Sequence, residues 1–328
     1  MVPRRDAHAL LAYLALSLPR AYPYEELVTE NGRRSRTVPE YELVDTGIFD
    51  DGRYWVVTVD YAKASPYDLL MRITVENAGP DLATLDIMPT VWFRNTWAWG
   101  PTDHSRPSLR ADDGAIVGHH DRAGQLVLTG NGAPELLFCE NETNTRRLYG
   151  AADGPTYPKD GINDYIVNGA ATVNPHQHGT KAALYYRISV PSGGSQVIRV
   201  RLVGGDDSES ADIDLADEYD GVIATRKAEA DTFYGARTPA HCTQEEARVL
   251  RQAFAGLLWS KQFFHLDVER WLDGDPGQPP PPPGRGAIRN GAWRHLNNHE
   301  ILLMPDPWEY PWYAAWDLAF HCVAFGAH

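Results

Sequence analysis

The stretch YWVVTVDYAKASPYDLLMRITVENAGPDLATLDIMPTVWFRN, from Tyr54 to Asn95, decides the fold class of this chain. Its apolar runs are short, rich in β-branched and aromatic residues, and bounded by Ser, Pro, Gly and Asp, a pattern typical of strands. Residues 54–61 alternate as a half-buried strand does. Residues 69–80 end on a turn and a new run begins at Ala83, so this pair of runs is predicted to form a hairpin.

The strand pattern continues to about residue 205. The runs at 124–130, 135–140, 181–194 and 195–205 repeat it at spacings too short for crossover helices, which favours antiparallel pairing. A sheet with one apolar face needs a second sheet to cover it. Residues 21–205 are therefore predicted to form an antiparallel β-sandwich.

A helical region is predicted to follow the sandwich. Residues 206–240 are charged and helix-prone, and we interpret them as a helical linker. Thr243 and Glu246 then have the spacing of a capping box, and apolar residues recur at three- and four-residue steps, which predicts a long amphipathic helix ending near Gly274. A run of five prolines indicates an extended spacer or surface loop. Residues 241–328 cannot bury a core alone, so we expect this second domain to be incomplete.

The first 20 residues have no place in this scheme. Two arginines precede an apolar run from Ala9, an arrangement that loosely imitates a secretory signal. Pro19 and Arg20 interrupt the run where cleavage would fall, so a short amphipathic lead-in is favoured. No other segment approaches the ~20 apolar residues of a transmembrane helix.

Composition narrows the class of partner. The 328 residues, 43% of them apolar, suffice for two folded domains. The net charge is −14 and basic residues are not clustered, which argues against nucleic acid or an anionic membrane as a partner. Cys139, Cys242 and Cys322 lie far apart without the spacing of a disulfide framework or a zinc site, so we expect a cytoplasmic protein.

The stretch WEYPWYAAWDLAFHC, at residues 308–322, sets a single carboxylate, Asp317, among aromatic side chains. Pro311 suits the first position of a helix, which we predict to run from Trp312 to about Phe325. This helix is apolar nearly all round, so we expect it to be buried. Its side chains divide between two faces, with Trp312, Trp316, Phe320 and Val323 on one and Tyr313, Asp317 and His321 on the other.

Burial would decide what Asp317 can do. Desolvation disfavours the charged form of a carboxyl, and the helix N-terminus, worth about 0.3 to 1 kcal/mol, opposes it less strongly. We therefore expect Asp317 to stay protonated near neutral pH. A protonated carboxyl beside indole rings suits a sugar-cleaving site, where sugar faces stack on indole and the acid protonates the glycosidic oxygen. Two structural alternatives stay open: Asp317 caps a turn, or it pairs with an arginine such as Arg294, with the tryptophans as core.

Other patterns are weaker. The histidine clusters at 118–121, 176–178 and 295–299 lack further ligands at a recognisable spacing, so neither a metal nor another cofactor is predicted. The Asn-rich connections at 139–150 and 157–169 either form Asx turns or offer hydrogen bonds to a polyol ligand.

A family resemblance extends over roughly residues 21–322. Its blocks are VDYAKASPYDLLMRITVENAGP, LDIMPTVWFRNTWAWG, ENETNTRRLYG, KDGINDYIVNG, RQAFAGLLWSKQFFHLDVERWLDGDPGQPPPPP and RNGAWRHLNNHEILLMPDPWEYPWYAAWDLAFH. With these blocks the chain resembles bacterial proteins related to glycoside hydrolase family 63, a group that includes processing α-glucosidases and mannosylglycerate hydrolases.

The resemblance implies a β-sandwich, a helical linker and an (α/α)6 barrel, of which residues 241–328 would be the first helices in a chain truncated at both ends. It implies inverting hydrolysis of a small α-glucoside or α-mannoside by an acid and a base about 6.5 to 9.5 Å apart. The family's acid motif matches WDLAFH and places the acid at Asp317, whereas the base lies beyond this chain. We expect little activity from the chain alone. The residues expected to contact the saccharide are Trp308, Trp312, Tyr313, Trp316 and His321.

Two alternative functions remain open. The chain could be a non-catalytic carbohydrate-binding or interaction module, in which the loops that carry Asn141 and Asn163 bind a glycan. It could also belong to an inverting glycoside phosphorylase, in which phosphate replaces the base.

Overall fold

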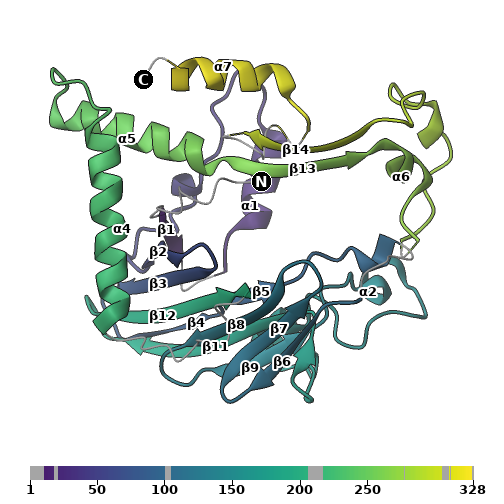
Figure 1. The fold of residues 1–328 in the computed structure, drawn as a ribbon, viewed down its shortest axis with the longest axis horizontal. Coiled ribbons are helices and arrows are strands. Elements are labelled where there is room, and N and C mark those ends of the chain that lie inside the picture. The colour runs from purple at the N-terminus through teal and green to yellow at the C-terminus, as the bar shows by residue number, and fades with distance from the viewer. Residues whose placement is uncertain are drawn as a thin grey trace. The chain divides into compact units, whose positions relative to one another are not determined.

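The computed structural model describes residues 11–17, 21–99, 105–205, 217–276, 278–304, 310 and 312–326. These residues form two compact units, whose helices and strands are drawn in Figure 1. Unit 1 contains the described residues up to 95 together with 105–205 and 217–228. Unit 2 contains residues 96–99 and the described residues from 229 onward.

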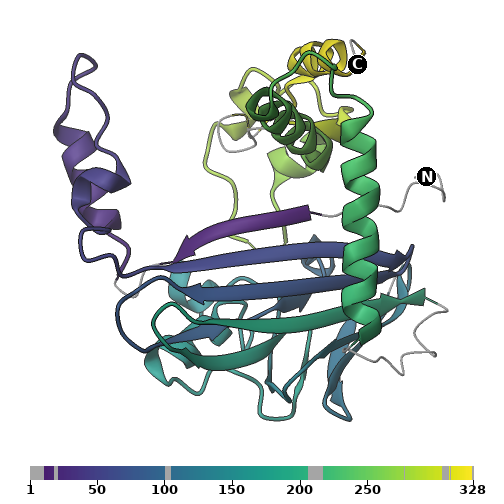
Figure 2. The ribbon, with the colours of Figure 1, turned by 90° about the vertical axis from the view of Figure 1, so that its left-hand side faces the viewer.

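Unit 1 is built from two antiparallel sheets (Figure 2). One has eight strands in the order β1-β2-β3-β12-β8-β7-β6-β10, and in the other, four-stranded sheet β4, β5 and β9 all pair with β11. The antiparallel sheets predicted from the sequence are therefore confirmed. The strands are β1 (Leu11–Ser17), β2 (Trp55–Ser65), β3 (Asp68–Asn77), β4 (Ala83–Ile87), β5 (Thr90–Trp92), β6 (Ser108–Asp112), β7 (Ala115–His120), β8 (Gly124–Gly130), β9 (Glu135–Cys139), β10 (His178–Gly179), β11 (Lys181–Val190) and β12 (Ser195–Gly204).

The hairpin predicted between residues 69–80 and the run from Ala83 is wrong. β3 pairs with β2 and β12, so both of its edges are occupied, and β4 pairs with β11 in the other sheet. After β3 the chain leaves the eight-stranded sheet, and the buried Asn77 side chain holds the turn at which it does so. Its amide donates to the carbonyl oxygens of Asp81 (2.7 Å) and Val190 (2.8 Å), which ties the turn after β3 to the end of β11.

The two sheets pack face to face. Gly130 of β8 has no side chain, and Leu184 and Tyr186 of β11 fill the space that a Cβ there would occupy. The apolar residues between the sheets are almost fully buried, and their burial supplies most of the driving force for folding. They include Leu109, Ile116, Leu128, Leu184, Ile188 and Ile198.

The start of a long helix packs on the outer face of the eight-stranded sheet of unit 1. At the start of α4 (Asp217–Gly235), Tyr219 and Ile223 pack on Ala62 and Leu70, and the Tyr219 hydroxyl donates to the Val200 carbonyl oxygen at 3.2 Å. The other helices of this unit are α1 (Tyr24–Arg33), α2 (Thr145–Tyr149) and α3 (Gly161–Asn168), with a 3-10 turn at Leu43–Thr46.

The apolar run near the N-terminus forms a strand. β1 pairs antiparallel with β2, with Leu11 opposite Tyr61 and Ser17 opposite Trp55. An amphipathic lead-in was expected here, but the unpaired edge of β2 offers backbone hydrogen bonds that a run of seven residues can satisfy as a strand.

Unit 2 combines helices with a β-hairpin. The capping box is confirmed, because the Thr243 hydroxyl accepts from the Glu246 amide and the Thr243 amide donates to the Glu246 carboxylate at 2.7 Å. The prediction that this helix runs to Gly274 is wrong: it ends at Trp259 and a strand follows. The elements are α5 (Gln244–Trp259), β13 (Lys261–Asp267), α6 (Val268–Asp273), β14 (Asn297–Leu303) and α7 (Ala315–Gly326), with 3-10 turns at Trp97–Trp99 and Arg285–Ala287.

The described part of unit 2 does not form an (α/α)6 barrel. It contains the helices α5, α6 and α7 and the antiparallel pair β13–β14. None of the helices in the described residues is long and apolar enough to cross a membrane.

Candidate functional site

The candidate site is α7, which is seated on the β13–β14 hairpin through one ridge of side chains. The Tyr313 ring, just before the helix, lies 5.5 Å from the Phe264 ring of β13, measured between centroids. His321 Nδ1 lies 3.2 Å from the Leu303 carbonyl oxygen at the end of β14. Asp317 lies in the first turn of α7 between these two anchors and is half-buried. The predicted alignment of Tyr313, Asp317 and His321 on one face fits this arrangement.

The opposite face of α7 is exposed. Trp316 is 72% exposed and Phe320 62%, and their rings make an edge-to-face contact with centroids 5.5 Å apart. Trp312 precedes the helix and is 52% exposed. The prediction of a helix buried on all sides is wrong, and so is its start at Trp312, because α7 begins at Ala315 and packs on the hairpin through a single ridge.

Asp317 has no structural partner within the described residues. Its carboxylate forms no hydrogen bond or ion pair there. The predicted alternative partner Arg294 pairs instead with Asp273 at 2.6 Å and with Glu269 at 3.6 Å. Both structural alternatives for Asp317, a cap and an ion pair with Arg294, therefore lack support in this part of the chain.

The structure brings together most of the predicted site residues on one short segment. Trp312, Tyr313, Trp316, Asp317 and His321 all lie on α7 or just before it. The predicted contact at position 308 lies outside the described residues. Phe264 was missed because its segment was predicted to be helical, although apolar and polar side chains alternate over residues 264–267, which is also a strand signal.

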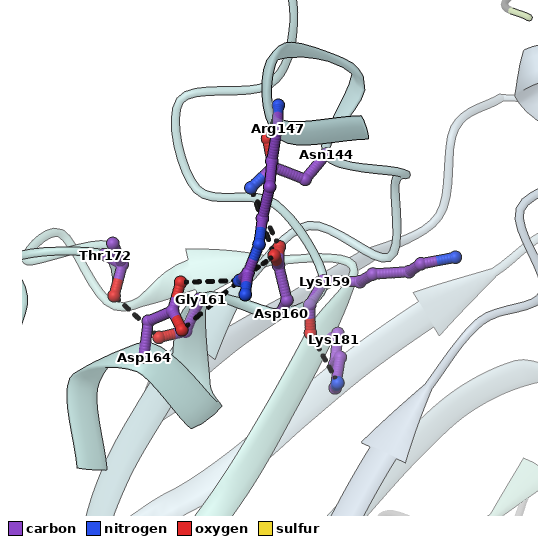
Figure 3. A network of polar contacts seen from close by, with 8 residues as sticks. All are labelled: Asn144, Arg147, Lys159, Asp160, Gly161, Asp164, Thr172 and Lys181. Carbon is purple, nitrogen blue, oxygen red and sulfur yellow. Dashed lines mark hydrogen bonds and ion pairs between the residues drawn. The ribbon is translucent and has the colours of Figure 1, made fainter. Parts of the chain in front are cut away.

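The Asn-rich connections form a network of polar contacts in unit 1 (Figure 3). The Asn144 side chain accepts from the Arg147 amide at 3.1 Å and so caps α2. The Arg147 guanidinium lies 3.1 Å from the Asp160 carboxylate and 3.3 Å from that of Asp164. Asn141 donates to the Phe93 carbonyl oxygen at 2.8 Å. These side chains fix loops to one another, whereas Asn163 on α3 is exposed, so glycan binding by these loops stays a prediction.

The histidine clusters do not form a metal site in the described residues. No group of three or more His, Cys, Asp or Glu side chains is arranged there to hold a metal ion. His119 instead lies 3.6 Å from the Asp121 carboxylate, and the ring of His120 stacks on Phe93.

Two solved structures show a distant likeness to the chain. A candidate kojibiose phosphorylase from the human microbiome has a TM-score of 0.28 and 7% identity, over 66% of this chain and 23% of that one. The family GH92 inverting mannosidase of Bacteroides thetaiotaomicron has a TM-score of 0.30 and 10% identity, over 66% of this chain and 26% of that one. Likeness at this level does not establish a shared fold or activity.

A sequence relative is found in yeast. The chain is 35% identical to Uncharacterized protein YMR196W of Saccharomyces cerevisiae, over 93% of this chain and 32% of the yeast protein. No family model matches the sequence. The chain is therefore related in sequence to this yeast protein and spans about a third of its length.

Proposed function

We propose that this chain carries the acid side of a glycoside-cleaving site, with Asp317 as the general acid. The substrate class is a small α-glucoside or α-mannoside, cleaved with inversion as in proteins related to glycoside hydrolase family 63. In this proposal α5 and α7 are the first helices of a barrel, and no residue of this chain is assigned the role of the base.

The observation that carries the proposal is the half-buried Asp317 carboxyl, which has no partner in the described residues. A carboxyl held by an ion pair or a cap would be occupied by that role, whereas this one can still meet a ligand. Its position between Tyr313 and His321 restrains the helix turn that carries it, since both of those residues contact the hairpin. Restraint of this kind orients a general acid toward the oxygen it protonates.

The aromatic side chains would bind the sugar. Indole is a flat apolar surface with a polar edge, and the C–H faces of a pyranose can pack on it while the sugar hydroxyls stay hydrated. Trp316 and Trp312 offer such surfaces on the exposed face of the segment that carries the acid. Without a base to activate water, we expect binding and protonation by this chain but little hydrolysis.

Saccharide binding followed by tryptophan fluorescence tests the proposal. Titration with methyl α-glucoside and methyl α-mannoside should give saturable changes that Trp316→Ala removes. The matched control is Trp293→Ala, because Trp293 is also in unit 2 and is 54% exposed but lies on another segment. Equal titrations for the wild-type chain and Trp316→Ala would exclude a sugar platform on α7.

A further inference from the structure

Two histidines meet across the β13–β14 hairpin, which is drawn in Figure 1. His265 of β13 is directly opposite His299 of β14, and their ring centroids are 4.9 Å apart. Side chains alternate between the two faces of a strand, so the pair lies on the other face of the hairpin from Phe264, whose ring meets Tyr313. The pair is therefore separate from the candidate site on α7.

The spacing of the two imidazoles suits a shared metal ion. Opposite residues of an antiparallel pair have Cβ atoms about 4.5 to 5.5 Å apart, which lets both side chains reach one point. With a metal–nitrogen bond of about 2.0 to 2.1 Å, a ligated imidazole has its centroid roughly 3.2 Å from the metal. Two such ligands at a right or tetrahedral angle have centroids roughly 4.5 to 5.2 Å apart, and the observed 4.9 Å lies within this interval. The rings stand at 80° to each other, and His299 is exposed, so its ring has room to turn a nitrogen toward the ion.

The ring nitrogens of both histidines are uncommitted. Within the described residues neither imidazole forms a hydrogen bond or an ion pair, and both make ring contacts alone. The His120 ring differs, because its Nδ1 accepts from the Arg122 amide at 3.1 Å. His295, the other histidine of the 295–299 cluster, stacks on Trp293 with centroids 5.8 Å apart and takes no part in the pair. An imidazole with a free nitrogen is the commonest protein ligand of metal ions.

Aromatic side chains flank the pair. The Phe263 ring lies 5.0 Å from the His299 ring and 6.1 Å from the His265 ring. The Trp99 ring lies 5.9 Å from that of His265. An apolar shell of this kind limits the access of water to a metal site and so favours the bonds between ligand and metal.

The charges near the pair do not favour a hard cation. Asp267 is the next side chain along the same face of β13, and its carboxylate accepts from the Arg270 amide at 3.1 Å. The Arg270 guanidinium lies over the Trp99 ring and donates to the Trp99 carbonyl oxygen at 3.2 Å. Mg²⁺ and Ca²⁺ need several oxygen ligands, whereas imidazole suits zinc, copper and nickel. The pair therefore fits a transition-metal ion.

A bridging ion would strengthen a weak element of the fold. β13 and β14 form a sheet of two strands only, and such a hairpin is marginally stable by itself. One ligand from each strand would join the two strands through the ion. Because the ion binds the folded hairpin, it would raise the stability of unit 2.

We propose that His265 and His299 together bind one divalent transition-metal ion, such as Zn²⁺, Ni²⁺ or Cu²⁺, which cross-links the hairpin. The two imidazoles are the protein ligands, and water fills the other positions around the ion. The described residues hold no group of three or more such ligands, so this is a site of modest affinity. The inference does not depend on the function proposed for α7.

Isothermal titration with NiCl₂ at about pH 7.5, where imidazole is mostly neutral, tests the proposal. We expect saturable binding of one Ni²⁺, weakened about 10-fold or more by either His265→Gln or His299→Gln, because each removes one arm of a chelate. The double variant should lose little more than either single variant, since both residues serve one ion. The matched control is His176→Gln in unit 1, from another pair of histidine rings, 6.4 Å apart, and it should bind as the wild type does.

Thermal melting gives a second readout of the same site. NiCl₂ should raise the melting temperature of the wild-type chain and not that of His299→Gln, which alters an exposed side chain and should leave the fold intact. Three results would overturn the proposal. They are equal Ni²⁺ affinity in the wild type and both single variants, additive losses in the double variant, and a loss confined to His176→Gln.

Discussion

Arg294 directs its guanidinium to Asp273, with 2.6 Å between Nη2 and Oδ2, and not to Asp317. Because Asp317 has no partner in the described residues, its charge should contribute little to folding. We expect Asp317→Asn to change the free energy of unfolding by no more than about 0.5 kcal/mol, measured by urea denaturation. A loss of several kcal/mol would assign Asp317 a structural role instead.

The ion pair between Asp68 of β3 and Arg201 of β12 should be a main polar contribution to unit 1. Asp68 is 6% exposed, and the Nε–Oδ1 distance is 2.8 Å. The hydrogen bond to Asp68 raises the pKa of Arg201. Asp68→Ala leaves the guanidinium without its partner and should cost about 3 to 5 kcal/mol.

The matched control for this pair is Asp112→Ala on β6. Asp112 pairs with Arg110 at 2.7 Å, but both side chains are more than half exposed, so the cost should be about 0 to 1 kcal/mol. Equal losses in the two variants would contradict the account of the buried pair.

Stability should decline in alkali because of buried groups that hold their protons. Burial raises the pKa of the Cys139 thiol from 9.0 to about 11, so the folded chain binds this proton more tightly than the unfolded chain does. The stability that results is fully present below about pH 9 and is lost as the pH rises toward 11. Urea denaturation across this range should show the decline, and Cys139→Ala should reduce it. A Cys139→Ala chain with the same pH dependence as the wild type would contradict this assignment.

The exposed face of α7 should be nearly irrelevant to the stability of the chain. Phe320→Ser should change the free energy of unfolding by about 0.5 kcal/mol or less, because most of that side chain already contacts water. Leu302→Ala on β14, where the side chain is 3% exposed, should cost about 2 to 5 kcal/mol. A large loss for Phe320→Ser, measured by the same urea denaturation, would show that this face is covered.

Local sequence patterns predicted where the strands of this chain lie better than they predicted which strands pair. Alternation identified β2, β3, β11 and β12 because a half-buried strand leaves its period in the sequence. The partner of β4 could not be predicted in this way, since it is β11, about a hundred residues further along. β13 is a similar case. Its seven residues are too few to distinguish the period of a helix from that of a strand, and the pairing with β14 makes them a strand.

For the candidate site, too, the sequence predicted local features but not contacts with distant segments. The sequence separated the two faces of α7 correctly, because helical spacing alone determines which side chains align. It could not show which face is covered, since that depends on elements elsewhere in the chain.

The measurement that tests the central claim most directly is azide-dependent methanol release from methyl α-glucoside. Azide needs no base, so it can attack C1 from the β face while the bond from C1 to the methoxy oxygen breaks and Asp317 supplies the proton that turns the leaving group into methanol. The account predicts release of methanol with formation of β-glucosyl azide, lowered roughly 100-fold or more in Asp317→Asn. Equal rates for the wild-type chain and Asp317→Asn, or no release above the spontaneous reaction, would contradict the role of Asp317 as the acid.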